Sequence, residues 1–199
     1  MDRPIDSQRS KVYKAEDRCF RLMQTGTTVD PIVSEHTAIQ VTAASAKIDG
    51  LNHCLIQLER WISHTWFRER WPNITKINLA NGAGSRRATG TLWYGNTARI
   101  KLPIFARNKW VMLHELAHVV TPKNGAAHGR EYCANYLLLV QHYLGRDVAK
   151  LLRHEFQRGR VQYKPKIVMS EKQLTALRER FAKVRMTSIA AKDDTHGKQ

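Results

Sequence analysis

Residues 108–120 read NKWVMLHELAHVV, an apolar-rich segment that holds two histidines four positions apart. Apolar residues recur in it at steps of three and four, which predicts a helix with one buried stripe made of Trp110, Leu113, Ala117 and Val120. Asn108 is a residue type that caps helix starts, and Pro122 follows the segment as a stop signal. The segment therefore predicts a helix that carries both histidines.

His114, Glu115 and His118 form the pattern His-Glu-x-x-His inside this predicted helix. Residues four apart lie one turn apart on the same helix face, so both imidazoles can reach one zinc ion at about 2.0–2.1 Å. Glu115 leaves the helix beside them and can take a proton from a water bound to that ion. The pattern predicts a hydrolase with one zinc per chain and Glu115 as general base.

A hydrolytic zinc site needs a third protein ligand and an open position for water. Residues 122–127 contain proline and glycine, so they can turn the chain back towards the helix. His128 comes directly after them and is the preferred third ligand. Glu131 is the alternative, because a carboxylate on a helix is equally sound ligand chemistry.

This pattern and the segment HGREY at residues 128–132 resemble the SprT-like and Spartan-type zincins, in which a His-Gly-x-Glu-aromatic element supplies the third zinc ligand. Residues 7–17, SQRSKVYKAED, resemble an uncharacterised family of small metallohydrolases from actinobacteria and their phages, and that similarity extends over residues 7–160. The resemblance implies a zincin-like metallopeptidase domain. It assigns His114, His118 and His128 to zinc and Glu115 to catalysis.

Two features depart from the Spartan-type pattern. The loop that leads to the third histidine is shorter here, and Cys19, Cys54 and Cys133 are too few and too far apart for the zinc ribbon of some SprT-like proteins. We therefore expect three reduced, inert thiols. An activity on DNA-linked proteins does not follow from this resemblance.

The remaining sequence predicts an α+β domain with a small, mostly antiparallel sheet, an active-site helix and flanking helices. Helical periodicity predicts helices over residues 7–24, 46–67, 130–144 and 147–158. Strand-like segments lie at 37–42, 74–80, 89–94 and 98–102. We expect a metallohydrolase domain at 1–160, a basic amphipathic helix at 161–186 and a flexible tail at 187–199.

Residues 98–102, which end at Pro103, are predicted to form the sheet edge next to the active-site helix. An extended peptide substrate could add to such an edge through backbone hydrogen bonds. An edge strand protected by Arg99, Lys101 and Pro103 is an equally good interpretation. The candidate oxyanion or substrate contacts are Tyr132 and Tyr94, which no sequence pattern places beside the metal.

The chain of 199 residues carries 33 Lys and Arg against 17 Asp and Glu, a formal net charge of +16. Such an excess favours contact with nucleic acid, and solvated helix faces explain it equally well. The candidate nucleic-acid contacts fall in a glycine-rich turn and near the C-terminus: Arg86, Arg87, Lys172, Arg178, Arg180, Lys183 and Arg185.

No apolar run has the length of a signal peptide or a membrane span, so we expect a cytoplasmic protein without a membrane partner. Three functions fit these features. The first is a zinc metallopeptidase that cuts a protein or peptide substrate, near nucleic acid or away from it. The second is a basic nucleic-acid-binding protein with a non-catalytic zincin fold, and the third is a regulatory peptidase that cuts one specific protein partner.

Overall fold

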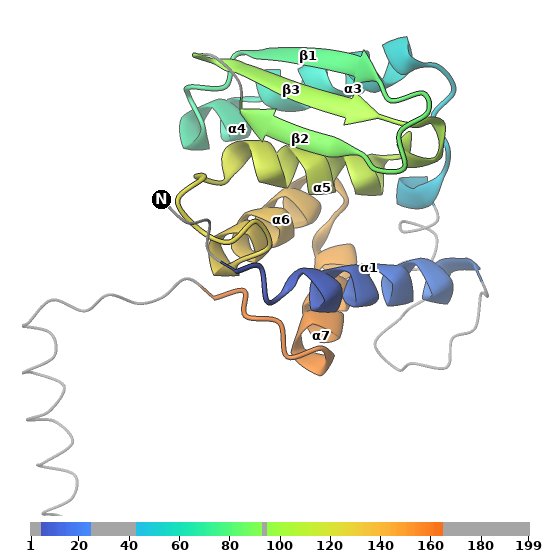
Figure 1. The fold of residues 1–199 in the computed structure, drawn as a ribbon, viewed down its shortest axis with the longest axis vertical. Helices are drawn as coiled ribbons and strands as arrows, with labels where there is room; N and C mark the ends of the chain where they lie inside the picture. The colour runs from blue at the N-terminus through green and yellow to red at the C-terminus, as the bar shows by residue number, and fades with distance from the viewer. Residues whose placement is uncertain (1–4, 25–42, 93–94, 165–199) are drawn as a thin grey trace, which may run out of the picture. The chain divides into compact units, whose positions relative to one another are not determined.

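The computed structural model describes residues 5–24, 43–92 and 95–164 (Figure 1). Residues 1–165 form one compact unit, which contains all of them. Several predicted features lie outside the described residues: the strand at 37–42, residues 165–186 of the predicted C-terminal helix, the tail at 187–199, and the site candidates Tyr94, Lys172, Arg178, Arg180, Lys183 and Arg185. Residues 161–164, the start of that predicted helix, are described and are not helical.

The described helices and strands confirm the α+β class. The helices are α1 (Arg9–Gln24), α3 (Leu51–Ser63), α4 (Thr65–Arg70), α5 (Lys109–Val120), α6 (Arg130–Tyr143) and α7 (Arg146–Arg158), with a 3-10 turn, η1, at Ile104–Ala106. The strands are β1 (Lys76–Asn81), β2 (Thr89–Leu92) and β3 (Thr97–Leu102). The helices predicted at 7–24, 130–144 and 147–158 agree with α1, α6 and α7 to within two residues.

The sheet of the described residues is mixed, with the strand order β1-β3-β2. β2 pairs antiparallel with β3, while β1 pairs parallel with β3 along its whole length. The prediction of a mostly antiparallel sheet was therefore wrong. Alternation along a strand shows which side chains are buried and carries no information on the direction of the neighbouring strand.

β3 is the central strand of this sheet, so the prediction that residues 98–102 form an edge was wrong. Ala98, Ile100 and Leu102 are fully buried, whereas Arg99 between them is exposed. The charges that suggested edge protection lie instead on one face of a central strand. Among the described residues the two edges are β1 and β2, and β2 is the one that runs beside α5 (Figure 1).

The single helix predicted at 46–67 is two helices that meet at His64. α3 begins after Gly50, whose φ of 82° lies in the region that favours glycine. His64 has an extended backbone, and its Nδ1 accepts a hydrogen bond from the N–H of Trp66 at 3.2 Å, which caps α4. The apolar spacing gave no sign of the break, because Phe67 beyond it is still fully buried.

Four helices lie on one side of the sheet, and each packs against the next one away from it (Figure 1). α5 packs against β2, α6 against α5, α7 against α6, and α1 against α7, while α3 covers β1. α5 therefore lies between the sheet and another helix. This position explains why its side chains are buried on nearly every side. In the part of the chain that the structure describes, no helix is long and apolar enough to cross a membrane.

Candidate metal centre

Helix α5 carries the predicted motif, and its start is fixed as the sequence predicted. The Oδ1 of Asn108 accepts a hydrogen bond from the N–H of Val111 at 2.9 Å. The predicted stripe of Trp110, Leu113, Ala117 and Val120 is buried. His114 and Glu115 are buried on the same helix, only 4% and 5% exposed, so two groups that water normally solvates lie inside the protein.

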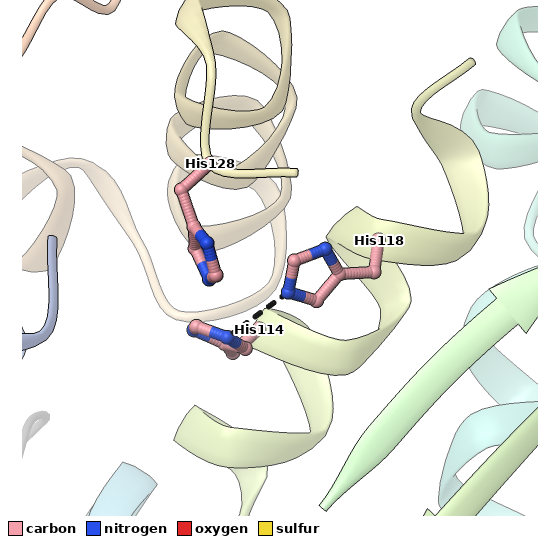
Figure 2. Close-up of side chains that lie close together, drawn as sticks. All are labelled: His114, His118 and His128. Carbon is pink, nitrogen blue, oxygen red and sulfur yellow. Dashed lines mark hydrogen bonds between the residues drawn. The ribbon is translucent and has the colours of Figure 1, made fainter. Parts of the chain in front are cut away.

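The structure brings the three predicted histidines together, as Figure 2 shows. One nitrogen from each of His114, His118 and His128 lies within 4.8 Å of the other two. The Nε2 atoms of His114 and His118 are 3.3 Å apart, close to the spacing of about 3.3 Å expected for two nitrogens on one tetrahedral zinc ion. Glu131, the alternative ligand, is exposed on the first turn of α6 and is not part of the group.

A buried atom of His128 indicates what the group could hold. Its Nε2 is shielded from solvent and has no hydrogen-bond partner among the described residues. A buried polar atom without a partner is costly, which is why nearly all such atoms are paired. A metal ion bound between the three imidazoles would supply that partner. The residues present therefore fit a divalent metal that prefers imidazole nitrogen.

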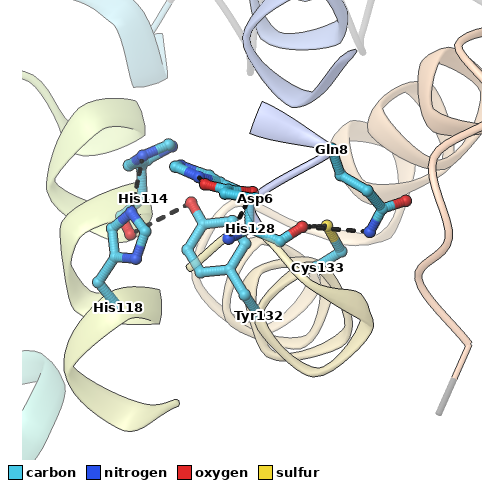
Figure 3. Close-up of polar contacts among 7 residues, drawn as sticks. All are labelled: Asp6, Gln8, His114, His118, His128, Tyr132 and Cys133. Carbon is cyan, nitrogen blue, oxygen red and sulfur yellow. Dashed lines mark hydrogen bonds and ion pairs between the residues drawn. The ribbon is translucent and has the colours of Figure 1, made fainter. Parts of the chain in front are cut away.

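Two carboxylates from the N-terminal part of the chain, Glu16 and Asp6, hold the outer nitrogens of two of these rings. Figure 3 shows the Asp6 side chain beside His128. The Nδ1 of His114 is 2.7 Å from Oε1 of Glu16, and the Nδ1 of His128 is 2.7 Å from Oδ2 of Asp6. A carboxylate accepts, so each Nδ1 carries the proton and each Nε2 keeps its lone pair for a metal. This carboxylate–histidine pairing is typical of metal centres.

The segment that supplies these carboxylates is tied to the centre by further contacts. Gln8 is buried, and its Nε2 donates to the backbone oxygens of His128 and Gln162, both at 3.2 Å. Asp6 also accepts from the backbone N–H of His128 at 3.3 Å. Cys133 Sγ, from helix α6, donates to the backbone oxygen of His128 at 3.5 Å (Figure 3). The position of the third histidine is thus fixed from both sides.

Burial and neighbouring charges set the protonation of the cluster. Burial and the adjacent imidazoles lower the pKa of His118 to about 2, and burial is also the main reason that the pKa of His128 is lowered. Burial lowers the pKa of His114 too, but the charge and hydrogen bond of Glu16 outweigh it, so the net shift is upward. His118 and His128 are therefore neutral at physiological pH, the form that binds metal.

Glu115 lies beside the histidines and against strand β2. Burial raises the pKa of its carboxyl to about 7, with a further contribution from Glu16, while the charge of His114 and a hydrogen bond from the Gly90 backbone oppose the shift. β2 crosses α5 very closely at this point. A Cβ atom on Gly90 would overlap the Glu115 carbonyl oxygen and lie 2.7 Å from its carbonyl carbon.

Aromatic rings enclose the cluster on two sides. Tyr132 is fully buried, its ring stacks on His118 with 4.3 Å between centroids, and its hydroxyl donates to the His114 backbone oxygen at 3.4 Å. Tyr13 of α1 is 40% exposed and stacks on His114 at 5.5 Å. Its pKa is raised by burial and by the charges of Glu16 and Glu115. Tyr13 is therefore the tyrosine that faces both the centre and solvent.

The remaining predicted residues divide into two sets. Arg86 and Arg87 are exposed, and they line a cavity of about 360 Å³ together with His114 and Glu115. The basic candidates from Lys172 onward and Tyr94 are outside the described residues. The cysteines are free and buried as expected, and burial raises the pKa of Cys133 to about 12.

Sequence reasoning missed Asp6, Glu16 and Tyr13. All three lie in or next to the stretch at residues 7–17 on which the family resemblance was noted. No local pattern could pair them with histidines that follow 98 to 122 positions later. The available signal was one acid and a tyrosine on an amphipathic helix and a second acid just before it, which solvated surface helices also have.

Comparison of the chain with protein-family models, with curated proteins and with solved structures found no match. The assignment of the centre therefore rests on the contacts within the chain itself: three imidazoles that converge, two carboxylates that orient them, and a glutamate held beside them.

Proposed function

We propose that the chain is a zinc-dependent metallohydrolase, and most specifically a metallopeptidase with a zincin-like domain. One observation carries the proposal: three buried or half-buried imidazoles converge while carboxylates occupy the outer nitrogens of two of them. A structural zinc site has four protein ligands, whereas a hydrolytic site has three and keeps one position open. The three histidines fit the second case.

Zinc is the metal that best suits this donor set. Three neutral imidazoles without thiolate or additional carboxylate ligands form the set found in zinc hydrolases. When bound, zinc would act as a Lewis acid that activates water and polarises a carbonyl group. His114, His118 and His128 would hold it, with Glu16 and Asp6 fixing the ring orientations of the first and the third.

Glu115 is suited to move the proton in this reaction. Its carboxylate would accept a proton from the attacking water and donate it to the amine of the departing product. A general base works best when its pKa lies near the working pH, and burial brings the pKa of Glu115 to about 7. The hydrogen bond from Gly90 holds the carboxyl in place between strand and helix.

Tyr13 is a better candidate for the oxyanion contact than Tyr132. The hydroxyl of Tyr132 is buried and donates to a helix carbonyl, so its contacts support the position of α5. Tyr13 lies over His114, is partly open to solvent, and lines the same cavity as Glu115. A hydroxyl there could donate to negative charge that develops on a substrate carbonyl.

An extended substrate fits strand β2 better than the strand that the sequence suggested. β2 is an edge of the described sheet, it packs on α5, and a cavity lined by Gly90, Thr91 and His118 lies against it. Another cavity, lined by His114 and Glu115, also contains Ala88, the residue before β2. A peptide that adds to this edge through backbone hydrogen bonds would pass over Glu115. β3 is paired on both sides and has no free backbone groups for this purpose.

Metal content is the first test. Purified wild type and the variants His114→Ala, His118→Ala, His128→Ala and Glu131→Ala would be analysed for bound metals, with folding checked by circular dichroism. We expect one zinc per chain in wild type and in Glu131→Ala, and loss of zinc in each histidine variant. A zinc-free wild type after reconstitution with zinc would contradict the proposal, as would zinc that is retained in the histidine variants.

Activity is the second test, with Glu115→Gln as the matched variant because it keeps size and hydrogen bonding. Zinc-loaded wild type would be incubated with a mixture of denatured proteins, and new amino termini would be identified by mass spectrometry. We expect cleavage by wild type and a loss of at least about 100-fold in Glu115→Gln, whose zinc content is unchanged. Equal turnover by both proteins would remove Glu115 from the mechanism. No cleavage, with tight and salt-dependent DNA binding, would favour the nucleic-acid-binding alternative.

A further inference from the structure

The cavity of about 360 Å³ beside the metal centre has an apolar floor. The floor is formed by side chains from α1, η1, α5 and the residue before β2: Phe20, Ala88, Phe105, Trp110 and Val111. Phe20 and Trp110 meet edge to face at 5.8 Å between centroids. Phe105 is 65% exposed, so its ring is accessible to a ligand in the cavity. The floor therefore suits a large apolar side chain.

Three guanidinium groups surround this floor, from Arg9, Arg86 and Arg87. All three residues are exposed, and none has a carboxylate ion pair among the described residues. Of the acids that line the cavity, Glu16 is bound to His114 and Glu115 faces the metal centre, so both already have a role. Only Asp17 is available to offset the three positive charges. The rim of the cavity therefore attracts a negatively charged group.

The second cavity beside the histidines, which His118 lines, has neither an apolar floor nor a group of arginines. Its volume is about 450 Å³, and it is lined by small or polar residues from β2 and the loop after α5, with Lys123 as its one basic side chain. Lys123 Nζ donates to the Leu92 oxygen at 3.0 Å, so its charge is partly engaged. This cavity has no aromatic lining and no group of arginines. Side-chain selection should thus occur at the first cavity.

We propose that this cavity selects polypeptide substrates that carry a large apolar residue and an acidic residue two positions apart, on the same face of an extended strand, next to the bond that is cut. The inference rests on the proposed function for the position of the bond. The apolar side chain packs on Phe20, Phe105 and Val111, and the acidic side chain meets Arg86 and Arg87. A peptide is favoured over a phosphodiester chain because the floor is apolar and aromatic.

The test measures binding, so that it does not depend on turnover. The full-length Glu115→Gln chain, loaded with zinc, would be titrated with fluorescent octapeptides that contain Phe-Ala-Glu, Phe-Ala-Lys or Gly-Ala-Glu at the centre, named Phe-Glu, Phe-Lys and Gly-Glu by their two test residues. We expect the Phe-Glu peptide to bind about tenfold more tightly than the Phe-Lys peptide, the ratio that one or two exposed ion pairs supply. We expect the Gly-Glu peptide to bind about fivefold more weakly than Phe-Glu, because it lacks the apolar group.

Two sets of variants assign the effect to the cavity. Reversing both rim charges with Arg86→Glu and Arg87→Glu should invert the preference, so that Phe-Lys binds better than Phe-Glu. The control Arg60→Glu with Arg68→Glu changes the net charge equally at exposed positions outside the cavity and should leave the preference as in wild type. Phe105→Ala, at an exposed position where folding is not at risk, should reduce the discrimination between Phe-Glu and Gly-Glu by about threefold.

The outcomes separate this inference from the proposed function. If the rim variant keeps the wild-type preference, or if Phe-Glu and Phe-Lys bind equally, the selectivity is overturned even when wild type cleaves peptides. If the preference appears and inverts as expected but wild type cleaves nothing, the peptidase proposal fails and the binding inference stands. A single-stranded oligonucleotide would be titrated in parallel, and its binding in place of all peptides, lost in the rim variant, would also overturn the inference.

Discussion

Two groups of histidines in this protein look alike in ring spacing and differ in their surroundings. His64 and His142 lie 4.9 Å apart between ring centroids, on the surface where α4 meets α6. In the metal centre the corresponding distances are 5.0 Å for His114 and His118 and 4.8 Å for His118 and His128. Distance between rings does not distinguish the two groups.

The partners of the rings distinguish them. His142 stacks on Trp66 with 3.9 Å between centroids, and the Nδ1 of His64 caps α4. Both surface histidines are exposed, and neither has a carboxylate partner among the described residues. In the centre, carboxylates hold two rings and leave a buried nitrogen without a partner. Fixed outer nitrogens are what metal-ligating histidines usually have, so these partners favour a metal site at the buried group and not at the surface pair.

Removing one histidine from each group should give the largest difference in zinc affinity between two variants. We expect His118→Ala to lower zinc affinity by about 1000-fold, because it removes one of three ligands. His142→Ala should leave zinc affinity unchanged. Competition with a chromophoric chelator at pH 7.5 measures both values. A surface variant that lost zinc to the same extent would show that the wrong group has been identified.

Removing the carboxylates should have a smaller effect on the same measurement. Asp6→Asn and Glu16→Gln should each weaken zinc binding by about 10- to 100-fold, because they loosen ring orientation and lower ligand basicity. Asp17→Asn, an exposed acid one position from Glu16, is the matched control and should bind zinc as wild type does. Unchanged affinity in both test variants would mean that the two carboxylates only support the fold.

The contact of β2 with α5 should be sensitive to one methyl group. Gly90→Ala places a Cβ against the Glu115 backbone, so strand and helix must separate. We expect a loss of about 1–3 kcal/mol in the free energy of unfolding and reduced turnover, since Glu115 loses the Gly90 hydrogen bond. Urea denaturation measures the first effect. Gly125→Ala, where nothing lies within 4 Å of the new atom, is the control and should unfold as wild type does.

The contribution of the surface histidine His142 to the stability of the fold should depend weakly on pH. Burial, and then the charges of His64 and Arg70, lower the pKa of His142 below its ordinary value of 6.5. Well above pH 6.5 the ring is almost entirely neutral in both the folded and the unfolded chain, so it contributes almost no pH dependence there. As the pH falls below 6.5 the unfolded chain takes up the proton more readily, and stability should fall. His142→Gln should reduce this fall between pH 7 and pH 5 in thermal denaturation, and an unchanged profile would contradict it.

Local spacing was enough to predict helix α5 and the residues that converge on the centre. His114 and His118 are placed by one helix turn, and His128 by a short loop with proline and glycine, so their proximity is a local property. Asn108 was likewise identified as a cap because capping acts over three residues. Nothing in the sequence beyond such short spacings was needed for these assignments.

Properties that depend on distant segments were predicted poorly. The order and direction of β1, β2 and β3 depend on how the whole sheet packs, and alternation along one strand does not report it. The pairing of Glu16 and Asp6 with the histidines depends on α1 docking against α7. The break at His64 was hidden because the apolar residues on both sides face the same core.

The position of Glu16 and Asp6 near the start of the chain affects when the centre can assemble during folding. Glu16 precedes His114 by 98 positions, and Asp6 precedes His128 by 122. At roughly 5–20 residues per second of synthesis, the acids leave the ribosome on the order of ten seconds before the histidines. Helix α1 must therefore wait for α6 and α7 before it can dock, and contacts between such distant segments form late in folding. Metal uptake should then follow completion of the fold, so that the nascent chain is not expected to bind zinc in its final coordination.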